Sequence, residues 1–333
     1  MRAVIVNETG SIKGTSLAHV PEPVAAAGEV LVKIAATAIN YVDMLVIAGK
    51  YQFTPDTPFT PGKAPAGVIV ALGEGVTEFV IGDRVLAMAE EGAYAEYVSI
   101  SQVQCYRLPD SLTFTDAAAM ALGYDTAWVA LRERARLQSG QSVLVLGATG
   151  AVGYAAVQVA LAMGARVLAS VSSIEKRDQA LAAGADEVID LSRDNIRDSL
   201  REQVYAVNDD TGVDVVIDPL GDKYQEAALR VLNWRGRLVV VGFAAGEIPL
   251  IKANYLLLKN IEVSGLQISD YRKRMPELMK ECFTDIFSLY DAGKIQPATV
   301  KTYTLSEYLN ALKDVRDRTT AGRVVLDMTS QSD

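Results

Sequence analysis

Residues 141–163 restrict the fold of this 333-residue chain more than any other part of the sequence. Residues 142–146 form a short apolar run, which is typical of a strand buried on both faces of a parallel sheet. Residues 154–163 contain neither glycine nor proline and carry small apolar side chains, which is typical of a helix. Between them, residues 147–153 read Gly-Ala-Thr-Gly-Ala-Val-Gly, without a bulky side chain. The segment therefore predicts a strand, a tight turn and a helix in direct succession.

The turn at residues 147–153 is suited to an anion. The main-chain N–H groups of such a turn, and the positive end of the helix dipole, face a bound phosphate directly. A diphosphate can approach the backbone at Gly150, and the helix can lie close to the strand at Gly153. Ala148 stands where the pattern G-x-G-x-x-G has its first glycine, but the flanking strand and helix supply the required context. We expect the diphosphate of a bound dinucleotide to contact this turn, which consists of Gly147, Ala148, Thr149, Gly150, Ala151, Val152 and Gly153.

The composition argues against several classes of partner. A net charge of −9 is poorly suited to nucleic acid or an anionic membrane surface. No apolar run reaches the ~18 residues needed to cross a bilayer, and residues 1–6 are followed at once by Asn7 and Glu8, unlike a signal peptide. Two distant cysteines, Cys105 and Cys282, give no disulfide framework, which suits a reducing compartment. We expect a cytoplasmic protein without a nucleic-acid or membrane partner.

Residues 1–122 have a pattern of short strands and turns. Evenly spaced short strands without long helices predict a compact β-barrel-like domain. The pattern changes at Leu112, where Thr113 and Asp116 have the spacing of a helix capping box and an alanine-rich helix follows. The strand candidates of this domain are residues 29–36, 66–72, 83–88 and 93–99.

From residue 142 onward, strand and helix patterns alternate. Such alternation predicts a doubly wound parallel sheet with right-handed crossovers. The apolar sixth strand, residues 261–266, is either a dimer edge or internal to the sheet. An amphipathic helix at 275–291 follows, and a strand at 323–328 is expected to return to the first domain. The predicted strands are residues 142–146, 165–170, 187–190, 213–218, 237–242 and 261–266, with further helices at 175–183, 195–207 and 223–233.

The end of the second strand indicates which dinucleotide binds. Sheets that bind NAD usually place an acid about 20 residues after the glycines, where it accepts from the ribose 2′-hydroxyl. This chain instead has Ser172 and Ser173, followed by Lys176 and Arg177. If Ser173 caps the next helix, both cations lie near its first turn, where a bound 2′-phosphate would favour them. We therefore predict that NADPH binds here. The same residues are also compatible with a solvated basic turn that has no function.

The sequence offers no ligand set for a metal. Zinc sites need three or four His, Cys or acidic ligands at short spacings. The chain has one histidine, His19, in a polar segment where we expect it at the surface. We expect no metal site.

Motifs along nearly the whole chain resemble one family, the quinone oxidoreductase (zeta-crystallin-like) branch of the medium-chain dehydrogenase/reductase superfamily. The resemblance implies an α/β fold, with a Rossmann doubly wound parallel sheet at 123–267 and a GroES-like β-barrel catalytic domain at 1–122 and 268–333. It also implies NADPH and a homodimer. Besides the turn at 147–153, the motifs include Asn40-Tyr41-Val42-Asp43, Gly49-Lys50-Tyr51, Pro61-Gly62, Ala66-Gly67-Val68, Gly82-Asp83-Arg84-Val85, Gly184-Ala185-Asp186, Val240-Val241-Gly242, Leu257-Leu258-Lys259-Asn260 and Ala321-Gly322-Arg323-Val324.

The chain departs from this family at several positions. Zinc-dependent relatives carry Gly-His-Glu where this chain has Gly-Lys-Ala at 62–64, and their zinc-binding cysteine falls near Asn40. The family usually has glutamate at the position of Ala64 and often arginine near Ile47, and some members have tyrosine at the position of Leu45. These departures predict a more apolar pocket and weaken the expectation of classical quinone specificity.

The resemblance also assigns catalytic residues. It implies that Asn40, Asp43 and Tyr51 line the cleft between the two domains. Tyr51 falls where enoyl-reductase relatives have a tyrosine proposed as proton donor, and a phenol is protonated at neutral pH. From the residues alone, Asn40 is equally compatible with a turn cap and Tyr51 with simple packing.

Further cofactor contacts follow from the resemblance. Thr126 matches a threonine that helps to hold the cofactor, and Arg323 matches a basic residue near it. Asp218 is included among the matching cofactor-site positions. Gly242, Phe243 and Ala244 match the loop beside the nicotinamide, although Phe243 also suits a core position.

The expected activity is hydride transfer from NADPH to a quinone or to an α,β-unsaturated ketone or aldehyde. The cofactor supplies the hydride, and the protein supplies position and a dry site. Two alternatives stay open: a reductase of enoyl thioesters, and a non-catalytic NADPH-binding protein.

Overall fold

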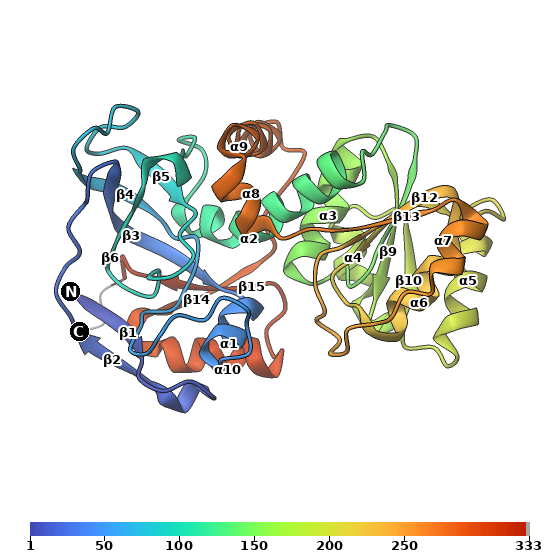
Figure 1. Cartoon of the computed structure of the whole chain (residues 1–333), viewed down its shortest axis with the longest axis horizontal. Helices are drawn as coiled ribbons and strands as arrows, with labels where there is room; N and C mark the ends of the chain where they lie inside the picture. Colours follow the sequence, from blue (N-terminus) through green and yellow to red (C-terminus); the bar gives the residue numbers. More distant parts are fainter. Residues whose placement is uncertain (331–333) are drawn as a thin grey trace. The chain divides into compact units, whose positions relative to one another are not determined.

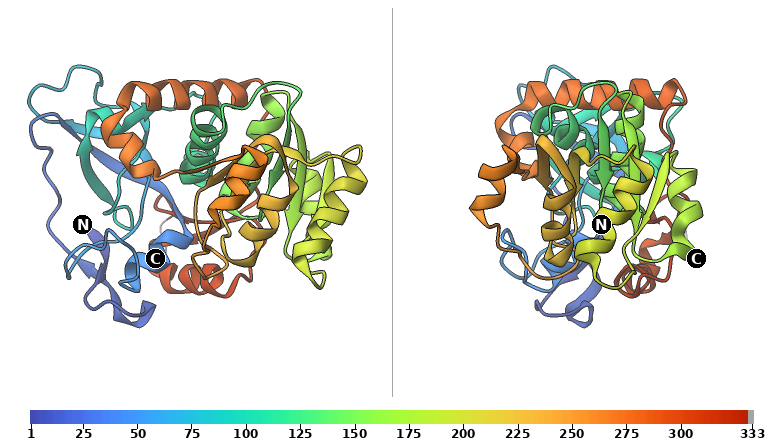
Figure 2. Two further views of the ribbon diagram at one scale, coloured as in Figure 1. Left: turned by 45° about the vertical axis from the view of Figure 1, so that its right-hand side comes forward. Right: turned by 90° about the vertical axis from the view of Figure 1, so that its right-hand side faces the viewer.

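The computed structural model describes residues 1–330 and forms two compact units (Figures 1 and 2). Unit 1 comprises Met1–Ala121, Arg272–Phe283 and the chain from Pro297 onward. Unit 2 comprises Leu122–Tyr271 and Thr284–Gln296. Two long helices, α2 (Phe114–Val129) and α9 (Pro276–Asp291), contribute residues to both units.

Unit 2 contains a six-stranded parallel sheet in the order β10-β9-β8-β11-β12-β13, which confirms the predicted doubly wound sheet. The order reverses between β8 and β11, and ligands of such sheets bind at the carboxyl ends of the strands at that point. The strands are β8 (Ser142–Val145), β9 (Arg166–Val171), β10 (Glu187–Asp190), β11 (Val213–Asp218), β12 (Leu232–Val240) and β13 (Glu262–Gly265). The helices are α3 (Ala151–Ala162), α4 (Arg177–Ala182), α5 (Ile196–Val207), α6 (Asp222–Val231) and α7 (Ala253–Lys259).

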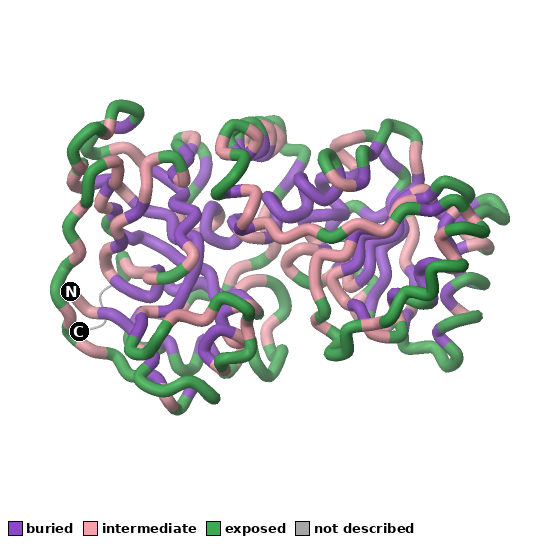
Figure 3. Tube along the Cα trace, in the orientation of Figure 1, coloured by how far each residue is buried: buried purple, intermediate pink, exposed green. Residues whose placement is uncertain are grey.

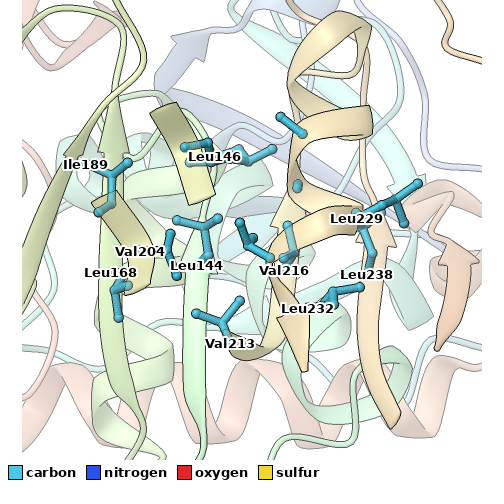
Figure 4. Close-up of a cluster of buried hydrophobic side chains, with 14 of the residues drawn as sticks. Leu144, Leu146, Leu168, Ile189, Val204, Val213, Val216, Leu229, Leu232 and Leu238 are labelled. Atoms are coloured by element: carbon cyan, nitrogen blue, oxygen red, sulfur yellow. The ribbon is translucent and has the colours of Figure 1, made fainter. Parts of the chain in front are cut away.

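The central strands of unit 2 are buried because helices cover the sheet (Figure 3). All four residues of β8 are buried, as expected for a strand without a solvated face. Side chains from strands β8 to β12 pack against α5 and α6 in one apolar cluster (Figure 4). Its members include Leu144, Leu168, Val216, Leu238, Val204 and Leu229.

Unit 1 is built on a seven-stranded sheet in the order β14-β15-β3-β4-β5-β7, with β6 also paired to β3. All its pairs are antiparallel except β14 with β15. The strands are β3 (Glu29–Ile39), β4 (Ala66–Leu72), β5 (Arg84–Ala87), β6 (Tyr97–Ser101), β7 (Cys105–Arg107), β14 (Val300–Thr304) and β15 (Arg323–Asp327), beside a hairpin of β1 (Arg2–Val6) and β2 (Thr15–His19). The helices are α1 (Tyr41–Ile47), part of α8 (Ile268–Arg274) and α10 (Tyr308–Asp317).

The long strand β3 places the candidate catalytic residues. It continues to Ile39, beyond the predicted end at residue 36, because its last part pairs with β15. Ile39 pairs with Val324, so Asn40 lies beside Arg323 although 283 residues separate them. The predicted return of the last strand to the first domain is thus confirmed.

Several elements differ from the sequence prediction. Helices α1, α7, α8 and α10 and strand β14 were not predicted, and Leu232 and Asn233 belong to β12 instead of the preceding helix. Thr284–Gln296, which follows the predicted boundary at residue 268, belongs to unit 2. There, Tyr124 Oη donates to the Gln296 carbonyl at 2.7 Å, and Trp128 Nε1 donates to Asp285 at 3.1 Å. Among the described residues, every helix is too short or too polar to span a bilayer.

Candidate functional site

The turn after β8 is held by the neighbouring strand. Gly147 has a left-handed backbone with φ of +61°, and its N–H donates to Ser170 Oγ at 3.2 Å. The N–H of Ala148 donates to the Ser170 carbonyl at 2.9 Å. Ser170 is fully buried in β9, so both of its oxygens fix the position of the turn. Sequence reasoning assigned no role to Ser170, because its partners precede it by more than 20 residues.

Two glycines of the turn have different functions. A Cβ on Gly153 would lie 2.2 Å from the Gly147 carbonyl oxygen, so the contact between helix and strand requires glycine there. A Cβ on Gly150 would have only an ordinary contact at 3.4 Å, and Gly150 is exposed as the N-cap of α3. Residues 149–152 all reach the surface, and the first N–H groups of α3 have no acceptor within their own helix. This surface fits the diphosphate of a dinucleotide.

The segment after β9 presents hydroxyl groups and cations. Ser173 is the N-cap of a short 3₁₀ turn and accepts from the Glu175 N–H at 3.4 Å, so the expected cap is present. Lys176 Nζ donates to the exposed Ser172 Oγ at 3.3 Å, and the exposed Arg177 begins α4. Hydroxyl and cationic groups gathered at the surface fit a 2′-phosphate.

Asp218 organises the loop after β11. It is fully buried, and its Oδ1 accepts from the N–H groups of Leu220 and Gly221, both at 2.9 Å. Its Oδ2 accepts from Gln225 Nε2 at 2.9 Å. Burial raises the pKa of Asp218 above its ordinary value, and these three hydrogen bonds oppose that effect. Asp218 therefore positions the loop after β11.

The loop after β12 is tied to the same region. The Val241 N–H donates to the Asp218 carbonyl at 2.9 Å, and the Ala244 N–H donates to the Pro219 carbonyl at 3.0 Å. Phe243 is 40% exposed, so the core position considered for it is wrong. Residues 242–244 thus present an aromatic face at the carboxyl end of the sheet.

Thr126 lies on α2 and is nearly buried. Its hydroxyl donates to the Leu122 carbonyl at 2.6 Å, one helical turn earlier. Its oxygen keeps lone pairs with which it can accept a hydrogen bond. The sequence places Thr126 with the cofactor residues, and in the structure it belongs to the same unit.

The catalytic candidates Asn40 and Asp43 form one network in unit 1. Asn40 is the N-cap of α1, and its N–H donates to Asp43 Oδ2 at 2.8 Å. Its side-chain Nδ2 donates to the Ala38 carbonyl at 3.2 Å, and its Oδ1 accepts from Arg323 Nη2 at 2.6 Å. Asn40 therefore caps a helix and is also fixed in orientation. Arg323, which sequence reasoning placed near the cofactor, holds Asn40 within unit 1.

Asp43 is too deeply buried to contact a substrate. It is 1% exposed, and its Oδ2 also accepts from Tyr94 Oη at 2.7 Å, whereas Oδ1 has no hydrogen-bond partner among the described residues. Burial raises the pKa of Asp43, and burial with the Asp43 charge raises the pKa of Tyr94 well above its ordinary value. Asp43 is thus a positioning residue for Asn40.

Tyr51 is half-buried and packs against the apolar core of unit 1. Its ring forms an edge contact with the exposed Phe53, with centroids 6.3 Å apart. On another side, Lys63 Nζ lies 5.8 Å from the Tyr51 ring centroid. Tyr51 therefore has the packing role that was the alternative to a catalytic one, and its ring also lies near the ammonium of Lys63.

Lys63 belongs to a buried ionic cluster that sequence reasoning missed. Its Nζ donates to the Glu90 carbonyl at 2.6 Å and to Glu90 Oε2 at 2.7 Å. Arg272 Nη1 donates to Glu90 Oε1 at 3.0 Å, and the Arg272 side chain is 1% exposed. The departure at 62–64, where this chain carries a lysine and zinc-dependent relatives carry a histidine, was the sequence signal that could have found this cluster.

Sequence reasoning also missed Tyr94, although Gly62 indicated that a bulky group lies close to the backbone there. Gly62 has a φ of +94°, and a Cβ there would lie 2.2 Å from the Tyr94 ring.

The other positions at which the chain departs from its family also lie in unit 1. Ala64 has a positive φ of 52° and is buried. Leu45 is half-buried, whereas Ile47 belongs to the core of unit 1.

The residues offer little to a metal ion. His19 is exposed at the end of β2. Within residues 1–330, no group of three or more His, Cys, Asp and Glu side chains is arranged to hold a metal.

One unit with a doubly wound sheet and a diphosphate turn, and a second unit of mostly antiparallel strands with a buried polar network, are typical of a two-domain dehydrogenase/reductase. Comparisons agree with this class. Residues 26–110 match the alcohol dehydrogenase GroES-like domain, and residues 151–284 match the zinc-binding dehydrogenase family.

Individual relatives narrow the class to a family. The chain is 36% identical to a quinone oxidoreductase-like protein 2 homolog of Nematostella vectensis, over 90% of this chain and 81% of the relative. It is 36% identical to the quinone oxidoreductase of Mus musculus, over 92% and 90%. The structure of the Escherichia coli quinone oxidoreductase complexed with NADPH aligns with a TM-score of 0.90 at 27% identity, over 98% of this chain and all of that chain. The chain belongs to the quinone oxidoreductase branch of the medium-chain dehydrogenase/reductase superfamily.

Proposed function

We propose that this protein is an NADPH-dependent oxidoreductase that reduces a quinone or an α,β-unsaturated ketone or aldehyde without a metal ion. The observation that carries the proposal is the pairing of the diphosphate surface at 149–152 with the serines and cations after β9. Bound NADPH supplies the hydride. The similar Escherichia coli quinone oxidoreductase has been solved with this cofactor.

On the cofactor side, the chain binds phosphate with main chain and with charge. Residues 149–152 and the N-terminus of α3 receive the diphosphate. Ser172, Ser173, Lys176 and Arg177 receive the 2′-phosphate that distinguishes NADPH from NADH. Asp218 and the loop at 242–244 shape the adjoining surface.

On the acceptor side, unit 1 supplies polar groups whose positions are fixed. The Tyr51 hydroxyl donates a proton when an enone is reduced, because hydride addition leaves an enolate that must be protonated. The amide of Asn40 donates to the Ala38 carbonyl and to Asp43 Oδ2 and accepts from Arg323, so Asn40 keeps this polar network in one orientation. A quinone can take its protons from solvent instead.

A metal has no part in this proposal. A metal-free mechanism is supported by the exposed position of the single histidine. It is also supported by Lys63, which stands where zinc-dependent relatives carry a ligand. An ammonium held by Glu90 repels a divalent cation.

An acceptor panel tests the function. Purified protein is mixed with NADPH and, in turn, with quinones, enones, enals and an enoyl thioester, and the absorbance of reduced nicotinamide is followed. We expect turnover with quinones or with conjugated ketones and aldehydes. Turnover confined to the thioester would instead show an enoyl-thioester reductase. Binding of NADPH without oxidation by any acceptor would show a non-catalytic protein.

We also propose that the protein forms a homodimer through the edge of the unit 2 sheet. Strand β13 is an edge strand of this sheet. The loop before α7 and α7 itself expose Ile248, Leu250, Leu257 and Leu258. Exposed apolar groups beside a free strand edge favour pairing with a second copy. Sedimentation of wild type and Leu257→Lys would test this, because a dimer that survives the substitution does not use this face. Cys105 and Cys282 are not joined in a disulfide, which supports a cytoplasmic location.

A further inference from the structure

Helices α2 and α3 meet at a glycine inside α2. A Cβ on Gly123 would lie 2.7 Å from the Ala151 carbonyl oxygen and 3.2 Å from its carbonyl carbon. A residue with a side chain at position 123 must therefore separate the two helices. Glycine inside a helix is less favourable than alanine, because it loses more backbone freedom on folding. The chain thus keeps an unfavourable helix residue at the point where α2 touches α3.

This contact falls on the candidate diphosphate turn, because Ala151 is both a member of the turn and the first residue of α3. Two further contacts join the same helices. The added Cβ on Gly123 would lie 3.7 Å from Ala155 Cβ, and Tyr124 Oη lies 2.8 Å from Gln158 Oε1. Residues 151, 155 and 158 have the spacing of one helix face. One face of α3, beginning at the diphosphate turn, therefore packs on α2 within unit 2.

Thr126 lies on the same side of α2 as Gly123, because residues three apart in a helix are neighbours on its surface. Thr126 is 8% exposed, and its hydroxyl donates to the Leu122 carbonyl at 2.6 Å, which fixes the side chain. The hydroxyl oxygen can still accept from a ribose hydroxyl or a carboxamide N–H of a dinucleotide. How closely α2 approaches α3 at Gly123 therefore sets the distance between the Thr126 hydroxyl and the diphosphate turn.

Given the NADPH site of the proposed function, on which this inference rests, we propose that Gly123 is a positioning residue for the cofactor. Gly123 admits α2 to the first turn of α3, and the Thr126 hydroxyl then contacts the same NADPH molecule whose diphosphate lies on the turn. Gly123 itself does not touch the cofactor and acts through Thr126. The cofactor is thus held by two helices whose spacing depends on one missing side chain.

A double-mutant cycle on NADPH binding tests the assignment. Gly123→Ala adds the Cβ that meets the Ala151 carbonyl, and Thr126→Val removes the hydroxyl at nearly constant shape. We expect each substitution to raise the NADPH dissociation constant by about tenfold in a fluorescence titration. The double variant should bind no more weakly than Gly123→Ala, because a displaced hydroxyl has no contact left to lose. Thr126→Ser, which keeps the hydroxyl, should bind like wild type.

Tyr124→Phe is the matched control. It removes the hydroxyl that contacts Gln158, so it weakens the same pair of helices but leaves the Gly123 contact in place. We expect lower stability in urea and wild-type NADPH affinity. If Tyr124→Phe weakens NADPH binding as much as Gly123→Ala does, cofactor affinity merely follows the stability of the helix pair, and the assignment is overturned.

Hydrogen exchange of wild type supplies a measurement that does not depend on the folding of a variant. With saturating NADP⁺ we expect slower amide exchange at residues 122–127 of α2 as well as at residues 149–154. Slower exchange in the turn alone would overturn the assignment, as would wild-type NADPH affinity in Gly123→Ala or additive losses in the double variant.

Failure of the proposed function has a different signature. A wild type that binds neither NADPH nor NADP⁺ removes the proposed cofactor, and the role of Gly123 falls with it. A wild type that binds NADPH but oxidises it with no acceptor removes only the proposed activity, and the double-mutant cycle still decides the role of Gly123.

Discussion

The candidate binding sites of the two units are built from different parts of the chain. In unit 2 the candidate site is main chain: a turn shaped by Gly147 and Gly153 presents N–H groups, and the buried Ser170 holds it. In unit 1 the candidate site is made of side chains, and Asn40 depends on Arg323, a partner 283 residues away. A phosphate site can therefore be encoded in one short segment, whereas the acceptor site exists only once the sheet of unit 1 has formed.

The largest effect is expected at the turn. Gly153→Val places carbon atoms against the Gly147 carbonyl oxygen, so the helix must move away from the strand. We expect a loss of ~1–3 kcal/mol in the free energy of unfolding and more than about a hundredfold in NADPH affinity, measured by urea denaturation and fluorescence titration.

Gly150→Ala is the matched control for Gly153→Val. Its Cβ makes only an ordinary contact with the protein but faces the diphosphate. We expect unchanged stability and about tenfold weaker NADPH binding. Wild-type cofactor affinity in both variants would contradict the assignment of the turn.

Two buried aspartates provide a second comparison between the units. Asp218 accepts hydrogen bonds on both oxygens, so Asp218→Asn brings an amide N–H against other donors. Asp43 accepts on Oδ2 alone, so Asp43→Asn can place its NH₂ at the position of Oδ1. We expect a loss of ~1–3 kcal/mol for Asp218→Asn and a smaller change for Asp43→Asn.

The Asp43 comparison also has a pH dependence. Burial raises the pKa of Asp43, so the folded state holds this proton more tightly than the unfolded chain. Wild type should therefore lose stability relative to Asp43→Asn as the pH rises above ~4, the ordinary range of an aspartate. Parallel denaturation curves of the two proteins at acid and neutral pH measure this difference, and equal slopes would exclude it.

Tyr51→Phe separates the two acceptor classes. We expect a loss of about tenfold or more in enone reduction and little change in NADPH binding, because only the proton donor is removed. Steady-state kinetics with one enone and one quinone measure this. Unaltered enone turnover would remove Tyr51 from the mechanism.

A single exposed cation is tested at the 2′-phosphate. Lys176→Ala removes one exposed cation beside Ser172, so NADPH binding should weaken by about tenfold while NADH binding stays the same. An equal change for both cofactors would move Lys176 away from the 2′-phosphate.

The same contrast explains how much the sequence predicts. The strand, turn and helix at 142–163 were predictable because all their determinants are local, and the alternation that follows gives the parallel sheet. Helices α1, α7 and α8 were not, since each has only seven residues and shows little periodicity.

The side-chain clusters could not be predicted from the sequence either. Glu90 is 27 residues from Lys63 and 182 from Arg272, and no local pattern joins them. Family resemblance identified Asn40, Asp43 and Tyr51 as candidates. It did not show that Asp43 is buried or that Lys63 lies beside Tyr51.

The central claim is that this chain uses the phosphorylated cofactor and no metal. The most direct test compares kcat/KM for NADPH and for NADH with one reducible acceptor, after exhaustive dialysis of the protein against a chelator. The account predicts turnover that survives dialysis and favours NADPH by about tenfold or more. Equal use of the two cofactors, or activity that returns only when zinc is added, would contradict it.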